Sequence, residues 1–272
     1  MPNWEEFLAK KNAAREPSPT IASGKPAEAT VVHTYLLRLA LAVEDTSSYW
    51  ERLDSSVPIP KRAKAAFEQQ WFGAMGLDRV RYLITSFVVR YDTFPNALTV
   101  LSRWPSMDIS TRQVICHWHL QLSDPIYRRF TGELLPKRRA LREPNVDRDI
   151  ALQWVKAEFP DKWSEPTCFQ LAGKLLTAAR EAGLVSRRDP RALSFPRVSD
   201  HALAYLLYLL RETRFEGTLT SSPYLKSVGL DEHLMTQRMP SLPGVALRKA
   251  SGGLVFDWAH KDLASWVKEV AL

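Results

Sequence analysis

The sequence predicts a mainly α-helical protein, and three observations point to this fold class. Long stretches rich in Leu, Ala, Arg and Glu favour helices. Prolines and glycines stand at the ends of these stretches, where helices begin and end. Eleven glycines against eighteen prolines argue against a glycine-rich β-sandwich or nucleotide-binding loops. With 45% hydrophobic and 25% charged residues, the 272-residue chain has the composition of a globular protein of one or two domains.

Residues 1–28 are expected to form an N-terminal arm and linker. The stretch 15–28 (REPSPTIASGKPAE) is rich in Pro, Ser, Ala and Gly and has no apolar periodicity. A helical bundle is expected over residues 29–185. Thr30 can cap its first helix, because the apolar residues that follow repeat on one helical face. These residues are Val32, Leu36, Leu39, Ala40 and Val43.

The remaining helices of the bundle are indicated by apolar periodicity between proline and glycine boundaries. Asp124-Pro125 opens one of them, which Pro136 is expected to stop, and Gly183 closes the last. The basic, proline-bearing stretch 186–198 (SRRDPRALSFPRV) is the expected boundary of the bundle. The expected helices are 60–76, a helix from 77 that ends before Pro95, 95–104, 110–122, 125–135, 145–159 and 166–182.

Beyond residue 198 the signals change to the order helix, helix, helix, hairpin, helix. Caps at Ser199 or Asp200, Ser222 and Asp231 begin three helices. Two alternating stretches, 245–250 and 254–258, are then separated by Ser251-Gly252-Gly253, a good hairpin connection. This order predicts a winged-helix module over residues 198–272, in which the third helix enters the major groove and the wing touches the backbone.

The polar residues of this module are the candidates for contact with DNA. Leu234, Met235 and Met239 are expected to face the core, which leaves the polar face of the third helix free to contact base edges or phosphates. Winged-helix modules also serve as protein-docking units, so this alternative remains open. The candidates are His233, Thr236, Gln237 and Arg238 on the third helix, and Arg248 and Lys249 on the wing.

The chain is basic, with 37 Lys and Arg against 30 Asp and Glu, a formal net charge of +7. The densest cluster lies between residues 128 and 142, where six cations accompany one acid, Glu133. Such a cluster could neutralise several phosphates if its members share one surface; otherwise it is a solvated helix end and loop. Its members are Arg128, Arg129, Lys137, Arg138, Arg139 and Arg142. A second group, which could extend the same face, is Lys174, Arg180, Arg187, Arg188, Arg191 and Arg197.

Signals for catalysis or metal binding are weak. The run Cys116-His117-Trp118-His119 lacks a second pair with metal-ligand spacing, so no metal is expected. No nucleophile elbow, Walker A loop or dinucleotide fingerprint occurs. We therefore expect a protein that is not an enzyme and has no cofactor.

The cellular compartment is expected to be the cytoplasm. Cys116 and Cys168 are too few and too far apart to indicate a disulfide framework. The first fifteen residues carry acids and bases without an apolar signal segment, and no apolar run is long enough to span a membrane.

Several stretches resemble a known family. Residues 146–185, VDRDIALQWVKAEFPDKWSEPTCFQLAGKLLTAAREAGLV, resemble the BrxA family of the bacterial BREX phage-defence systems, in which a small helical segment ends in a similar helix. The stretches RVRYLITSFVVRYDTF and ALTVLSRW look like the central helical bundle of that family. The resemblance implies an all-helical, non-enzymatic, DNA-binding protein. No residue role is carried over, because the family has no catalytic motif.

The expected function is therefore that of a non-enzymatic DNA-binding component of a BREX-like phage-defence system, with duplex DNA and other defence proteins as partners. One alternative is a protein-docking adaptor that would use Trp4, Phe7 and Leu8 of the amphipathic N-terminal segment as anchors. Another is an RNA-binding helical bundle.

Overall fold

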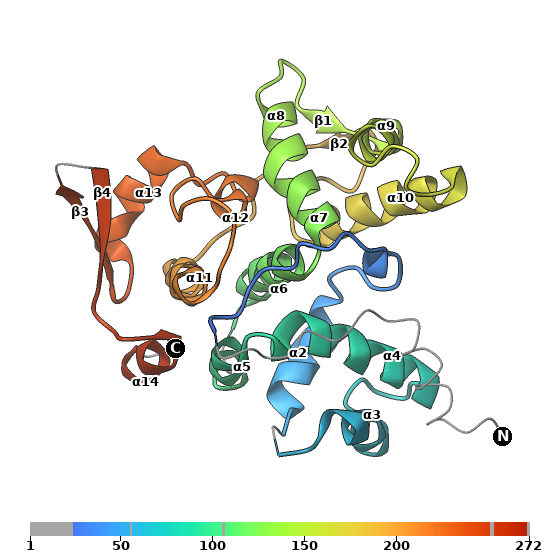
Figure 1. Cartoon of the computed structure of the whole chain (residues 1–272), viewed down its shortest axis with the longest axis horizontal. Helices are drawn as coiled ribbons and strands as arrows, with labels where there is room; N and C mark the ends of the chain where they lie inside the picture. Colours follow the sequence, from blue (N-terminus) through green and yellow to red (C-terminus); the bar gives the residue numbers. More distant parts are fainter. Residues whose placement is uncertain (1–23, 55, 105–106, 251–252, 271–272) are drawn as a thin grey trace.

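The computed structural model describes residues 24–54, 56–104, 107–250 and 253–270, and its architecture is mainly helical, as expected (Figure 1). The elements before the basic segment are η1 (Tyr35–Leu37), α2 (Val43–Arg52), α3 (Ile59–Glu68), α4 (Leu77–Phe87), the π-helical turn η2 (Val88–Asp92), α5 (Pro95–Ser102) and α6 (Ile109–Ser123). Those that follow are α7 (Pro125–Arg129), the π-helical turn η3 (Phe130–Leu134), α8 (Leu135–Arg139), β1 (Asn145–Val146), α9 (Arg148–Glu158), α10 (Glu165–Glu181) and β2 (Arg191–Ala192). The last are α11 (Asp200–Glu212), α12 (Pro223–Ser227), α13 (Glu232–Arg238), η4 (Met239–Ser241), β3 (Val245–Ala250), β4 (Gly253–Trp258) and α14 (Leu263–Glu269).

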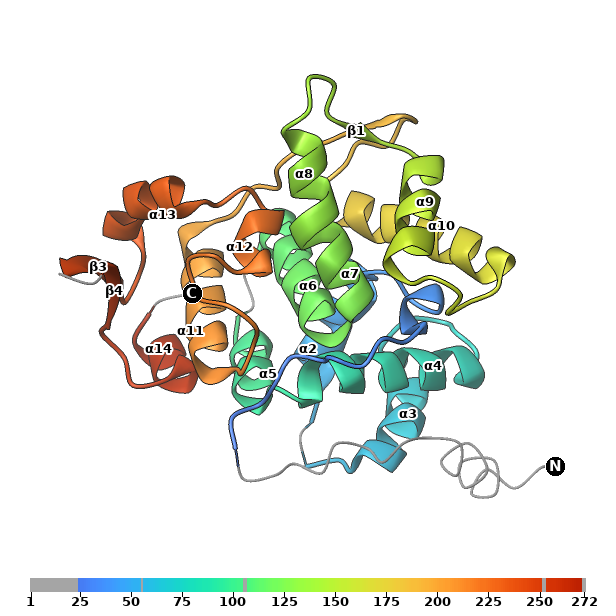
Figure 2. The ribbon, with the colours of Figure 1, turned by 45° about the horizontal axis from the view of Figure 1, so that its top comes forward.

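Helix α6 is the centre of the molecule. Figures 1 and 2 show α2 to α5 on one side of it, α7 to α10 on another and α11 to α14 on a third. Every residue of α6 from Val114 to the last, Ser123, is buried, polar side chains included. The carboxylate of Asp108 caps the helix by accepting the N–H of Thr111 at 2.9 Å. Since α6 has no solvent face from Val114 onward, the polar side chains of this part must find partners inside the protein.

The segment 30–42 is not the helix that its apolar spacing predicts. The Arg90 guanidinium donates to the carbonyl oxygens of Leu39 and Leu41, at 2.7 and 3.2 Å. The Glu181 carboxylate accepts the N–H of Leu41 at 2.9 Å. Both leucines are buried. The backbone groups of this segment are hydrogen-bonded by side chains distant in the sequence rather than by the bonds of a helix. The helix starts only at α2.

The helix expected over 60–76 ends earlier, at Glu68. Gln70 adopts a left-handed backbone with φ 49°, and the next N–H, of Trp71, reaches back to the carbonyl of Ala66 at 2.9 Å. This is the pattern of a Schellman C-cap, with glutamine where glycine is usual. The turn places Trp71 in the core, where it is 3% exposed.

Pro136 does not stop its helix, contrary to the expectation. The chain runs on from α7 through η3 into α8, which ends at Arg139. Pro136 lies just after the wide π-helical turn of η3, where the regular hydrogen bonding of an α-helix is already interrupted, so its lack of an N–H costs little.

The connection over residues 186–198 contains β2, which pairs antiparallel with β1. In register, Asn145 lies opposite Ala192 and Val146 opposite Arg191. This short ribbon ties the segment after α8 to the segment before α11. Because the pairing is antiparallel, the loop before β1 lies beside the residues that follow β2, where the N–H of Leu193 donates to the carbonyl of Pro144 at 3.1 Å, and the turn before β2 lies at the other end of the ribbon.

The C-terminal elements follow the expected order of three helices and an antiparallel hairpin, and α14 comes last. Leu247 lies opposite Phe256 in the hairpin, whose turn at residues 251–252 is outside the described residues. Helix α11 is buried from Ala202 to Leu210 and contacts α6, while α12 contacts η3 and α14 contacts α5. One continuous hydrophobic core thus joins these elements to the bundle. Leu234 of α13 is 39% exposed, contrary to the expectation, whereas Met235 and Met239 are buried.

Residues 26–29, which we call the strap, join the bundle to the loop after α11. The N–H of Arg214 donates to the carbonyl of Pro26 at 2.8 Å, and the N–H of Glu28 donates to the carbonyl of Arg214 at 3.0 Å. On the other side, the N–H of Ala29 donates to the carbonyl of Leu122 in α6 at 2.8 Å. The strap is therefore an ordered part of the fold, although it lies in or beside the stretch expected to be a linker.

No helix among the described residues combines the length and the apolar character required to cross a membrane. Cys116 and Cys168 are both free thiols and both buried.

Candidate nucleic-acid interface

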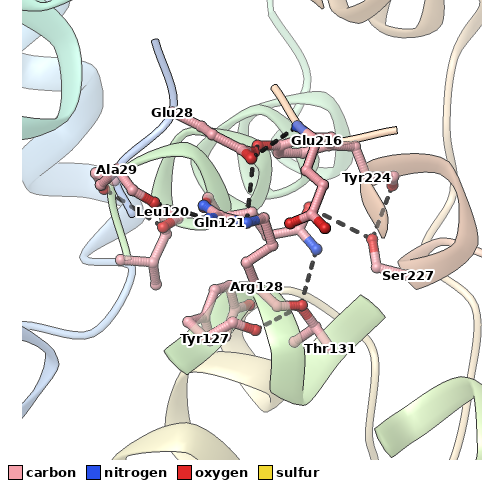
Figure 3. Close-up of polar contacts among 11 residues, drawn as sticks. Glu28, Ala29, Leu120, Gln121, Tyr127, Arg128, Thr131, Glu216, Tyr224 and Ser227 are labelled. Carbon is pink, nitrogen blue, oxygen red and sulfur yellow. Dashed lines mark hydrogen bonds and ion pairs between the residues drawn. The ribbon is translucent and has the colours of Figure 1, made fainter. Parts of the chain in front are cut away.

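Arg128 is committed to the interior of the protein (Figure 3). Its guanidinium donates to the carbonyls of Gln121 and Ala29, both at 2.7 Å, and its Nε lies 3.4 Å from a carboxylate oxygen of Glu28. The side chains of Arg128 and Glu28 are 12% and 6% exposed. Glu28 also accepts hydrogen bonds from the Tyr224 hydroxyl and from the N–H of Glu216. This arginine therefore anchors the strap and has little surface left for a phosphate.

Arg138 and Arg139 also use their guanidiniums to hold the fold together. Arg138 donates to the carbonyl and side-chain oxygens of Asn145, at 2.8 and 3.1 Å, which fixes the start of β1. Arg139 donates to the carbonyls of Ser227 and Ser194, at 2.8 and 2.9 Å. Burial lowers the pKa of Arg139 to about 10, which still leaves it charged at neutral pH.

Three members of the cluster reach the surface, and two of them have no carboxylate partner. Arg129 pairs with Glu158 at 2.9 Å. Lys137 and Arg142 are exposed, and no hydrogen bond or ion pair ties either to another described residue. The cluster of six thus divides into three arginines that hold the fold, one exposed ion pair and two free cations.

The second basic group adds exposed cations near the β1–β2 ribbon. Arg187 and Arg188 lie on the exposed turn before β2, whereas Arg191 is paired with Asp189. Arg142 lies in the loop before β1. Because β1 and β2 pair antiparallel, the loop with Arg142 lies at one end of the ribbon, beside Leu193, and the turn with Arg187 and Arg188 lies at the other end.

An exposed aromatic residue at the same end of the molecule is absent from the predicted set. Phe195 follows β2 and is 62% exposed, and the guanidinium carbon of Arg139 lies 4.5 Å from its ring centroid. Its position in the basic stretch SRRDPRALSFPRV is the one signal in the sequence, and the prediction of a domain boundary there does not identify it.

The polar residues of α13 and the hairpin differ in whether they are free at the surface or already paired with an acid. His233, Thr236 and Gln237 are exposed, and Gln237 Nε2 lies 2.9 Å from His233 Nε2. The two arginines are already paired, Arg238 with Asp200 and Arg248 with Asp257. Lys249 lies in β3, and its side chain is outside the described part of the chain. Asp231 and Glu232, both exposed, add negative charge where α13 begins, which disfavours phosphate there.

The histidines of the Cys-His-Trp-His run are partners in a buried polar network. His117 Nδ1 lies 2.8 Å from the Tyr127 hydroxyl and Nε2 lies 2.9 Å from Ser227 Oγ. His119 Nδ1 lies 3.2 Å from the Arg90 carbonyl and Nε2 lies 2.7 Å from the Tyr205 hydroxyl. Burial lowers the pKa of each ring to about 3, so both are neutral. With both nitrogens of each ring engaged, neither offers a free ligand atom for a metal.

Comparisons with known proteins give a fold likeness only. No protein-family model matches this chain, and no curated protein does. A solved structure of an uncharacterized protein from Magnetospirillum magneticum is similar, with a TM-score of 0.55 and 12% sequence identity over 74% of this chain and 99% of that one. At this identity the likeness shows a shared fold and nothing about activity.

Proposed function

We propose that this chain is a non-enzymatic, cytoplasmic DNA-binding protein that serves a BREX-like phage-defence assembly. In this proposal exposed cations around the β1–β2 ribbon contact the phosphates of duplex DNA. Residues 198–272 act as a winged-helix module, in which His233, Thr236 and Gln237 of α13 contact base edges. Other proteins of the defence system are its expected partners.

The observation that carries the proposal is the set of exposed cations at the two ends of one ribbon. Lys137 and Arg142 precede β1 at one end and have no carboxylate partner, whereas Arg187 and Arg188 precede β2 at the other end, where Arg187 lines a hollow together with Glu44, Asp45 and Glu181. Cations without carboxylate partners are available to phosphates at no cost of breaking an ion pair, and each phosphate contact releases a counterion. Arg138 and Arg139 hold this region in place through their hydrogen bonds to Asn145 and Ser194.

Charge reversal at the free cations tests the proposal. The variant Lys137→Glu/Arg142→Glu should weaken binding to duplex DNA of any sequence and lower the slope of log K against log salt by about 2, one unit per phosphate contact. Binding is measured by fluorescence anisotropy over a salt series. These substitutions are preferable to changes at Arg138 and Arg139, whose loss would break hydrogen bonds that hold β1 and α12.

A matched control makes the same change of net charge elsewhere. Lys61 belongs to α3 and Arg103 follows α5, and both are exposed. Figure 1 shows α3 and α5 on the opposite side of α6 from β1 and β2. The variant Lys61→Glu/Arg103→Glu should leave the salt slope unchanged. Equal losses from both double variants would mean that net charge, not this surface, determines binding.

A protein-docking role for α13 is the second candidate, and the exposure of Leu234 favours it. An apolar side chain that is 39% exposed, together with Asp231 and Glu232 on the same helix, fits a protein surface better than a phosphate backbone. If Gln237→Ala leaves DNA binding intact while Leu234→Asp abolishes capture of a defence protein in nuclease-treated extract, the helix faces a protein.

A further inference from the structure

Phe195 is an aromatic ring that the fold holds at the surface. It is 62% exposed, whereas the other exposed aromatic rings in the described part of the chain, Tyr35, Phe67 and Phe169, are 41 to 45% exposed. A large apolar ring left in water forgoes the favourable free energy of burial. Single exposed apolar residues are common on protein surfaces, so this exposure becomes informative only together with the fixed position of the ring and the charges around it.

The ring is fixed by three segments that are distant in the sequence. Arg139, at the end of α8, lies against the ring while donating to the carbonyl of Ser194 at 2.9 Å. Ser194 also donates from its hydroxyl to the carbonyl of Gly183 at 2.8 Å. On the α12–α13 turn, Gly229 has φ +78°, and a Cβ there would lie 2.2 Å from Phe195 Cε1, so the ring packs on bare backbone. A ring held this way loses little entropy when a ligand stacks on it.

The surroundings of Phe195 are positively charged. The segments that meet here, 137–143, 194–197 and 226–232, contain six Lys and Arg and three Asp and Glu, a net charge of +3. Four of the cations, Lys137, Arg142, Arg197 and Lys226, are exposed, and so are the three acids, Glu143, Asp231 and Glu232, the last two at the start of α13. An exposed aromatic ring among cations is the arrangement that binds single-stranded nucleic acid, because bases stack on the ring while phosphates meet the cations.

We propose that Phe195 is a stacking platform for an unpaired base. In a continuous duplex each base face is covered by its neighbours, so only a single strand, a gap or a strand end offers a free face to the ring. The protein should therefore prefer DNA that carries unpaired bases to blunt duplex of the same length. This inference rests on the proposed function, whose phosphate contacts would bring the strand to the ring.

The test compares two DNA ligands of equal nucleotide number, a blunt duplex and a duplex with a single-stranded tail, against the full chain. The wild type should bind the tailed duplex more tightly. Phe195→Ala should weaken binding to the tailed duplex by about 5-fold or more and leave the blunt duplex within about 2-fold. Phe195→Trp should retain the preference, because tryptophan also offers a face for stacking.

A second readout reports stacking itself, and a matched residue supplies the control. The fluorescence of a 2-aminopurine in the tail should be quenched more strongly by the wild type and by Phe195→Trp than by Phe195→Ala. Phe169 is the control, because it is also exposed and carries an arginine, Arg148, 4.7 Å from its ring centroid, but lies on α10. Phe169→Ala should bind and quench like the wild type.

The outcomes separate this inference from the function on which it rests. Binding of blunt duplex that is unaffected by Lys137→Glu/Arg142→Glu would overturn the proposed function, whereas duplex binding with no preference for a tail would overturn the stacking role alone. Equal losses for Phe195→Ala on both ligands, or unchanged 2-aminopurine quenching, would also overturn the stacking role. No binding of either DNA by the wild type would overturn both.

Discussion

Acid should destabilise this protein through two histidines at its centre, His117 and His119. Both are fully buried on α6 with neutral rings, and burial lowers the pKa of each from 6.5 to about 3. Because the folded pKa lies below the unfolded one, the unfolded chain binds protons first as the pH falls. The stabilisation is therefore complete above pH 6.5 and is lost progressively as the pH falls toward 3.

The magnitude follows from the two pKa values. At pH 5, each histidine is 1.5 pH units below its unfolded pKa, which corresponds to about 2 kcal/mol, so the pair costs about 4 kcal/mol relative to neutral pH. This is a large part of the 5–15 kcal/mol typical of a folded domain. Asp124 acts in the opposite direction, because burial raises its pKa and folding then favours its protonation.

Urea unfolding at pH 7.5 and pH 5.0 measures the effect, and substitution of the histidines isolates it. The variants His117→Gln and His119→Gln lose stability at neutral pH because each ring makes two hydrogen bonds. Each should nevertheless lose about 2 kcal/mol less than the wild type between the two pH values. A pH dependence identical in wild type and both variants would refute the reasoning, since acid would then act through other groups.

Two further predictions concern the strap and the contact between α12 and η3. Glu28→Ala should lower the free energy of unfolding by about 3–5 kcal/mol, because Arg128 keeps a buried, unpaired charge. In denaturant unfolding, the double variant Glu28→Ala/Arg128→Met should recover part of this loss. A double variant no more stable than Glu28→Ala would argue against a buried-charge penalty. Gly132→Ala should cost about 1–3 kcal/mol in thermal unfolding, because a Cβ would lie 2.5 Å from Pro223 Cβ and 3.0 Å from its Cα, which pushes α12 from η3. Gly173→Ala, whose Cβ meets only the end of the Arg148 side chain at 3.3 Å, is the matched control and should cost less; equal costs would contradict a role for the close approach to Pro223.

Local signals predict the helices well wherever the backbone satisfies its own hydrogen bonds. Ser199 and Asp231 cap α11 and α13, as expected, by accepting the N–H groups of Ala202 and Leu234, and Gly183 closes α10 with φ +73°. The segment 30–42 fails for a non-local reason. Its carbonyls and N–H groups bind Arg90 and Glu181, and nothing in the apolar spacing of the segment could reveal partners that lie far along the chain.

The basic cluster shows the same limit for the candidate site. Charge density along the sequence identifies six cations between residues 128 and 142 but gives no information on which carbonyls lie within their reach. Arg128, Arg138 and Arg139 meet backbone oxygens of Ala29, Asn145 and Ser227, which only tertiary packing brings near. Density alone therefore overestimates the number of cations available to phosphate.

The strap has a consequence for the order in which the chain folds during synthesis. Its Glu28 is hydrogen-bonded to residues 188 and 196 positions further along the chain, Glu216 and Tyr224. A ribosome delivers the N-terminal residues first, so the strap must wait, without these partners, until the loop after α11 and helix α12 have emerged. Contacts of such long sequence separation are slow to close because they carry a large loop entropy. Among the elements described, this N-terminal strap is therefore one of the first to be synthesised and one of the last to be locked in place.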